Sequence, residues 1–442
     1  MQCASLVFFD LETPGLIQEL DKNDPRRAPR VRPGDNQRSV QQIFDLYDQA
    51  DQTKETKIPK IMELSMVALP REDFFRCITQ VAEQHKDGKK DFRLERVACP
   101  IITLQCNPGL SEAQWEQYDK RGQYKFTNLL REDVANKLTF RQNWPIIRNF
   151  LDVLPAPIAL IAHNGLNFDF RILLNELKRN DLMTSQIFKE KVVFADTLLA
   201  FQSIEKAHHA VVRTVTESID WSRVRPHSPE EMQVDDSQQE APTSSMFQGN
   251  EGEGDNENTR LNASTNSIRS GLEVLDEFLD PDFSDATPTA SILKRPAAHQ
   301  LGLLTPNKRP PPPINPCKTA PPKFNLQRGF FEKCARNNPL RFMKHTEWSP
   351  AKVHRIRDDF FIKHADGSWS FHTQNAEKYF VENGRFKLQQ IYKDVFRADY
   401  KAHMAQEDCI ALLQVCSAYG KDFLNYIDTF AMPLRQYDPI SN

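Results

Sequence analysis

Asp10 and Glu12 stand two positions apart at the end of a short apolar run, residues 6–9. Because side chains alternate across a strand, both carboxylates would lie on one face while Leu11 points into the core. Two oxygen ligands at this spacing suit a Mg²⁺ or Mn²⁺ ion that also contacts a phosphate. The spacing is common by chance, so a solvated strand end is the alternative interpretation.

Two later segments offer further ligands. Asp169 follows an Asn164-Gly165 turn and begins an expected helix, where the helix dipole alone favours an aspartate by about 0.3–1 kcal/mol. His403 and Asp408 stand five positions apart, a spacing that does not share a helical face. His403 is therefore expected on the turn before the final helix, with Asp408 inside that helix. A plain surface histidine is the alternative.

A sheet with helices on its faces is needed to bring these residues together. Strand patterns occur at residues 6–9, 60–69, 96–106, 158–162 and at the start of 192–201. Helical patterns occur at residues 111–118, 140–154, 168–180, in the second half of 192–201 and within 401–420. Strands in succession followed by alternating helix and strand predict an α/β fold.

Composition divides the chain of 442 residues, 39% of them apolar, into three parts. Residues 1–225 and 324–442 carry the regular patterns and most of the aromatics, and the latter part includes an aromatic and basic extension. Residues 226–323 are rich in Pro, Ser and acidic residues and are expected to form a long disordered insertion within one folded domain. Residues of about 18–57 are strongly charged and are expected to form a mobile loop.

Charge and cysteine usage exclude some classes of protein. A net charge of −3 argues against a uniformly basic nucleic-acid binder, although a local basic surface remains compatible with it. The eight cysteines contain no CxxC pair and are expected to be reduced and mostly buried. No signal peptide is evident, and no apolar run approaches the ~20 residues of a membrane span. We therefore expect a soluble intracellular protein of the nucleus, the cytoplasm or both.

The order of these motifs (a strand DxE, a turn-helix Asp, and a late HxAxxD) resembles the motif set of the DnaQ-like (DEDDh) 3′→5′ exonucleases. The segments FFDLETPGL, IMELSMVAL, IALIAHNGLNFDF, FADTLLAF and FKLQQIYKDVF with HMAQEDCIALL resemble the three-prime repair exonuclease (TREX) family. This resemblance covers the N-terminal half and the C-terminal end of the chain. It implies a ribonuclease-H-like mixed sheet flanked by helices, with two bound Mg²⁺ or Mn²⁺ ions.

The resemblance also assigns roles residue by residue. His403 would be the general base of the catalytic set, whose metal ligands would be Asp10, Glu12, Asp169 and Asp408. Contacts to the terminal nucleotide would come from Glu12, Thr13, Leu16, Asn164 and Phe168. For Leu16 and Phe168, ordinary core packing is an equally good interpretation.

The expected function is a metal-dependent 3′→5′ exodeoxyribonuclease that releases mononucleotides from single-stranded or frayed DNA 3′ ends. An RNA-directed exonuclease is one alternative, because no residue of the motif set is expected to distinguish ribose from deoxyribose. A non-catalytic nucleic-acid or partner scaffold is the other. The resemblance implies a homodimer, formed through an edge strand such as residues 99–106. The insertion is a candidate site for a protein partner, and the aromatics of 324–380 would either bind single strands or pack against the domain.

Overall fold

The computed structural model describes residues 2–17, 42, 45, 58–86, 99–120, 127–183, 192–224, 339–343 and 348–434. The expected insertion, 226–323, lies outside the described residues, and so does the expected loop 18–57 apart from two of its positions. The expectations of disorder for these two segments, and of a protein partner for the insertion, therefore stay predictions.

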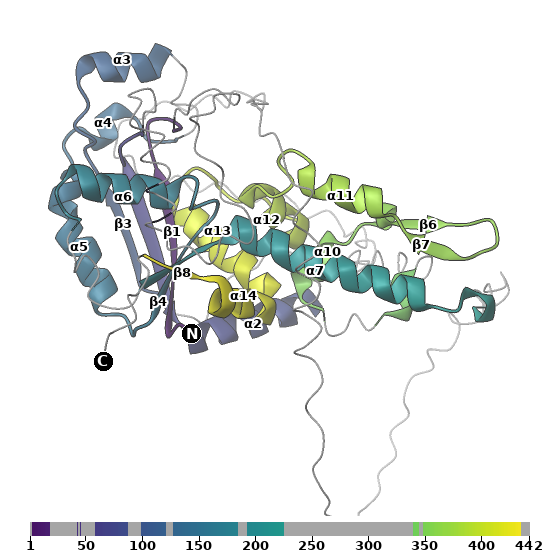
Figure 1. The fold of residues 1–442 in the computed structure, drawn as a ribbon. Helices are drawn as coiled ribbons and strands as arrows, with labels where there is room; N and C mark the ends of the chain where they lie inside the picture. The colour runs from purple at the N-terminus through teal and green to yellow at the C-terminus, as the bar shows by residue number, and fades with distance from the viewer. Residues whose placement is uncertain are drawn as a thin grey trace, which may run out of the picture.

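A mixed sheet lies at the centre of the described structure (Figure 1), with its strands in the order β3-β2-β1-β4-β5-β8. Its strands are β1 (Ser5–Glu12), β2 (Glu63–Pro70), β3 (Ile101–Gln105), β4 (Ile158–Ala162), β5 (Val192–Asp196) and β8 (Met432–Pro433). β4 pairs in parallel with β1 and with β5, whereas the other neighbours are antiparallel. The predicted α/β fold, a ribonuclease-H-like mixed sheet flanked by helices, is confirmed.

Alternating side chains of β1 pack into two separate cores, one on each face of the sheet. Phe8 packs into the core formed with α2 (Arg71–Lys86), α13 (Ala405–Tyr419) and α14 (Lys421–Phe430). Phe9 packs into the core formed with α5 (Phe140–Asp152) and α6 (Asp169–Arg179), on the opposite side in Figure 1. Both rings are fully buried, which is worth about 1.5–3 kcal/mol each. This double burial explains why the strand is a continuous apolar run.

A helical extension carries the aromatic residues beyond the sheet. α7 (Thr197–Ser218) runs toward the hairpin of β6 (Phe361–Lys363) and β7 (Trp369–Phe371) and toward α11 (Thr373–Val381) (Figure 1). Phe360, Phe361 and Phe371 are buried there. Of the two interpretations of the aromatic segment, packing against the domain holds for these three residues. The remaining helices are α3 (Glu112–Lys120), α4 (Arg131–Val134), α10 (Pro350–Arg355) and α12 (Leu388–Phe396).

A buried ion pair connects the parts of the domain on either side of residues 225–338. Arg355 of α10 donates from Nε to Glu205 Oε1 of α7 at 2.5 Å and from Nη1 to Asp394 Oδ2 of α12 at 2.8 Å. The hydroxyls of Tyr379 and Tyr419 also donate to the Glu205 carboxylate. These bonds satisfy a charge pair that would otherwise be costly to bury, and they fix α10 against α7.

The structure tests two expectations in part, namely that the cysteines are reduced and mostly buried and that the chain has no membrane span. Each cysteine in the described ranges is free, and all but the half-buried Cys99 are buried, in agreement with the expectation for them; Cys317 and Cys334 lie outside those ranges. No helix of the described residues is both long and apolar enough to cross a membrane.

Candidate metal centre

The end of β1 places two carboxylates on one face of the sheet. Asp10 and Glu12 follow Phe8 in the strand's alternation, so they lie on the face that α13 covers, while Leu11 is buried on the other face. Antiparallel pairing sets Glu12 opposite Glu63 of β2. Like charges directly opposite each other on neighbouring strands are destabilising, so this strand end holds more negative charge than the sheet alone would favour.

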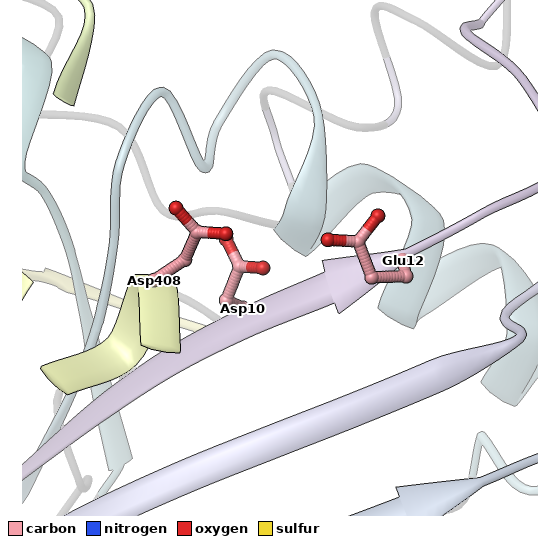
Figure 2. Close-up of side chains that lie close together, drawn as sticks. All are labelled: Asp10, Glu12 and Asp408. Carbon is pink, nitrogen blue, oxygen red and sulfur yellow. The ribbon is translucent and has the colours of Figure 1, made fainter. Parts of the chain in front are cut away.

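α13 adds a third carboxylate to this face. Asp408 lies in the first turn of the helix and is buried. One oxygen each from Asp10, Glu12 and Asp408 lie within 4.8 Å of one another, and Figure 2 shows the three side chains turned toward a common space. Residues almost 400 positions apart in the chain are thus brought into one cluster.

Asp169 lies beside this cluster without belonging to the group of three. It is the first residue of α6, is 3% exposed, and accepts a hydrogen bond from the backbone N–H of Leu11. The turn before it is tight, because a Cβ on Gly165 would lie 2.7 Å from the Cβ of Ala162. Asp196 orders the same turn by accepting from the N–H groups of Asn164 and Leu166, both at 3.1 Å.

Burial raises the pKa of the carboxyls of Asp10, Glu12, Asp169 and Asp408, and repulsion from neighbouring carboxylates adds to the shift for the first three. Burial is the largest cause for each of them. The pKa of Asp10 is held well above its usual range, by burial and then by Asp169, Asp408, Glu12 and Glu63. The pKa of Glu12 is raised to about 8 and that of Asp169 to about 8. The pKa of Asp408 is also raised, although the Tyr400 hydroxyl opposes the shift.

This set of side chains fits a hard divalent cation. Carboxylate oxygens are the ligands that Mg²⁺ and Mn²⁺ prefer. Without a cation, Glu12 faces Glu63 across the strand pair, and the pKa values of Asp10 and Glu12 are raised by burial and, to a smaller extent, by repulsion from neighbouring carboxylates. A bound cation would remove that repulsion and favour the ionised forms. Asp10, Glu12 and Asp408 are the residues that the geometry offers as ligands, with Asp169 next to them.

His403 lies where the spacing argument expects it, on a bend just before α13. Its side chain is exposed, and its backbone is left-handed with φ of +64°. That conformation is uncommon for a residue other than glycine. Asn128 Nδ2 donates to the carbonyl oxygens of Ala402 at 3.3 Å and of His403 at 2.8 Å. His403 is close enough to Asp408 to lower the pKa of its carboxyl, but it does not belong to the group of three.

The residues expected to contact the nucleotide differ from one another in burial and in hydrogen bonding. Thr13 is buried, and its hydroxyl donates to the carbonyl oxygen of Gly15 at 2.7 Å. Leu16 is 45% exposed, so core packing does not explain it. Asn164 is half-buried and accepts from Asn167 Nδ2 at 2.8 Å. Phe168 is half-buried and packs against the core between the sheet and α5 and α6. Their contacts to a nucleotide stay predictions.

Several residues that shape the site were not identified from the sequence. Glu63 accepts from the N–H of Ala405, the first residue of α13, at 3.3 Å, and Thr127 donates to Glu12. The Tyr400 hydroxyl donates a hydrogen bond to the Asp408 carboxylate, and the Asn128 amide donates one to the backbone carbonyl of His403. Only Glu63 carried a signal, because it is an acidic residue within the strand expected at residues 60–69. The other three depend on loop conformations that no periodicity encodes.

Comparisons with known proteins add little to this geometry. No protein-family model matches the chain, and no curated protein matches its sequence. Among solved structures, a match is the zinc-bound complex of Escherichia coli exonuclease I with single-stranded DNA, at 14% identity and a TM-score of 0.26. It covers 51% of this chain and 33% of that one, so the chain matches about a third of that protein's length. At this TM-score the likeness carries no argument, and the functional conclusion rests on the site.

Proposed function

We propose that this protein is a nuclease, a metal-dependent 3′→5′ exonuclease of the DEDDh kind that hydrolyses the terminal phosphodiester of DNA. One observation carries the proposal: carboxylate oxygens from β1 and α13 lie within 4.8 Å of one another at the end of a strand. The motif order, which resembles the TREX family, supplies the polarity and the choice of DNA. Membership of that family is part of the proposal.

Asp10, Glu12, Asp169 and Asp408 would hold two Mg²⁺ ions, or Mn²⁺ in their place. Bound there, the ions would activate a water molecule and offset negative charge on the reacting phosphate. His403 would take the proton from the attacking water, the general-base role that histidine side chains most often fill in enzymes. Its exposed position on the bend before α13 leaves it accessible to substrate.

The terminal nucleotide would lie against the segment that follows β1. Leu16, exposed by 45%, would stack on the last base, and the half-buried Phe168 would add a second apolar contact. Apolar stacking accepts every base, which suits an exonuclease without sequence preference. Glu12, Thr13 and Asn164 complete the proposed contacts to the 3′ end.

The partners of the protein are proposals of the same kind. Single-stranded DNA 3′ ends are the preferred substrate, and a second copy of the chain would pair along β3. β3 is the outer strand of the sheet on its side, and Ile101 at its start is 43% exposed. A location in the nucleus, the cytoplasm or both stays a prediction. Light scattering of the purified chain would measure the oligomeric state.

A labelled-oligonucleotide assay tests the proposed reaction. Single-stranded DNA carrying a 5′ label should shorten stepwise from its 3′ end with Mg²⁺ and stay intact with EDTA. Asp10→Asn should reduce the rate by at least about 10²-fold, whereas Asp220→Asn, on an exposed residue beyond α7, should not change it. Shortening of RNA but not DNA would assign the RNA-directed alternative. No shortening of either would leave the scaffold alternative.

A further inference from the structure

A tyrosine outside the expected catalytic set holds one of the proposed metal ligands. Tyr400 lies between α12 and α13, and its hydroxyl donates to Asp408 Oδ1 at 2.6 Å. Its ring packs against the ring of Tyr392, with centroids 4.9 Å apart. The ring contact fixes where the hydroxyl points, so the hydrogen bond is built into the fold of this loop.

The second oxygen of Asp408 is held from the opposite direction. Its Oδ2 accepts from the backbone N–H of Met404 at 3.2 Å. The two donors, one on each oxygen, fix the plane of the carboxylate. Each carboxylate oxygen has about two lone-pair directions, so a metal can still bind while both hydrogen bonds persist. The fixed carboxylate is the one that faces Asp10 and Glu12.

The chemistry of the donor matters as much as its position. An Arg or Lys at this place would neutralise Asp408 and compete with a cation. A phenol donates one hydrogen bond and adds no charge. A tyrosine hydroxyl keeps its proton at neutral pH, because a phenol ordinarily loses it only near pH 10, so it can donate to Asp408. Asp408 is thereby oriented without losing the negative charge that attracts a metal.

We propose that Tyr400 is a positioning residue that holds Asp408 in the orientation in which it binds the divalent cation. This inference rests on the proposed function, because it requires that Asp408 is a metal ligand. Donors that orient metal ligands typically change metal affinity by about 10–100-fold when they are removed. Tyr400 would therefore act on metal binding itself, before any substrate is present.

The test measures Mn²⁺ binding to the full-length, metal-free chain by calorimetry, without DNA. Tyr400→Phe removes only the hydroxyl and should weaken Mn²⁺ binding by about 10–100-fold, with the metal-free melting temperature nearly unchanged. Tyr392→Phe removes the hydroxyl of the neighbouring ring, which is tilted against that of Tyr400, and should leave the Mn²⁺ affinity unchanged to within about twofold. Asp408→Asn should abolish Mn²⁺ binding at the site to which Asp408 contributes a ligand.

Each outcome separates the inference from the proposed function. Wild-type affinity in Tyr400→Phe, together with lost binding in Asp408→Asn, would overturn the role of Tyr400 and leave the proposed function standing. An absence of Mn²⁺ binding to the wild-type chain would overturn both. If Tyr400→Phe proved less stable, DNA hydrolysis across a Mg²⁺ titration decides: a positioning role predicts recovery at high Mg²⁺, whereas a general loss of folded protein predicts a deficit at every concentration.

Discussion

Asn128 Nδ2 lies 2.8 Å from the carbonyl oxygen of His403, and this contact connects the segment before α4 to the bend that carries the proposed general base. The bend is left-handed at His403, with φ of +64°. Such a conformation costs roughly 1–3 kcal/mol and persists only where the surrounding contacts hold it in place. The adjacent Thr127 donates to Glu12. Two neighbouring residues thus contact both the end of β1 and the bend before α13.

Replacement of Asn128 should therefore separate turnover from metal binding. Asn128→Ala is expected to lower kcat by about 10-fold, because His403 then samples other orientations, with Mn²⁺ affinity unchanged. Asn375→Ala is a matched control, since the Asn375 amide also donates to an exposed backbone carbonyl, that of Asp359 at 3.0 Å. Single-turnover kinetics at saturating Mg²⁺ measure the effect. Equal rates in the two variants would show that the contact does not position His403.

The raised pKa values of Glu12 and Asp169, each about 8, predict an unusual dependence of stability on pH. Their folded-state pKa values exceed their unfolded values, so the native state binds more protons than the unfolded state between about pH 4 and pH 8. The contribution of these groups to stability is present below about pH 4 and is lost as the pH rises toward 8. Addition of Mg²⁺ should restore stability at the upper end of this window.

Thermal unfolding of the metal-free chain and of Glu12→Gln measures this effect. The variant should gain stability relative to the wild type as the pH rises, because it has no buried carboxyl to ionise at this position. The gain should be about 2–4 °C in melting temperature for each kcal/mol of stability. The difference between the two proteins cancels the titration of the groups that do not interact with Glu12. With saturating Mg²⁺ the order should reverse, because the variant loses a ligand. A constant difference at every pH would show that the pKa of Glu12 is not raised in the folded chain.

Replacement of Gly165 should show whether the tight turn after β4 is needed to position the Asp169 carboxylate. A Cβ at this position would lie 2.7 Å from the Ala162 Cβ and 2.8 Å from a ring carbon of Phe170, so Gly165→Ala should cost about 1–3 kcal/mol and weaken metal binding. Gly367→Ala is the control, because its Cβ meets nothing within 4 Å and only its φ of +83° is unfavourable. Urea unfolding and Mn²⁺ calorimetry should show loss of both properties in the first variant and of stability alone in the second.

Residues whose roles follow from periodicity were predicted well from the sequence. The strand at 158–162 coincides with β4, and the spacing of His403 and Asp408 placed one before α13 and the other inside it. These predictions succeed because burial on two faces or on one stripe leaves a repeating pattern. The meeting of Asp10, Glu12 and Asp408 was anticipated through motif order, which carries information that local spacing does not.

The sequence did not predict what depends on loop conformation or on distant contacts. Tyr400 and Asn128 lie in segments without periodicity, so nothing marked them as partners of Asp408 and His403. The aromatic segment was ambiguous because alternation with basic residues is compatible with stacking on bases and with burial. The burial of Phe360 against His209 and Tyr379 decides it for that residue.

The ion pair between Glu205 of α7 and Arg355 of α10 should contribute strongly to the stability of the fold. Both side chains are almost fully buried and pair at 2.5 Å. Glu205→Gln leaves Asp394 as the charged partner of the Arg355 guanidinium. The variant should destabilise the fold by up to about 3–5 kcal/mol, because the buried charge is then only partly compensated. Glu217→Gln breaks an exposed pair on the same helix, with Arg213 at 2.8 Å, and should cost at most about 0.5 kcal/mol. Urea unfolding measures both. Similar small costs in the two variants would mean that the Glu205–Arg355 pair does not stabilise the packing of α10 on α7.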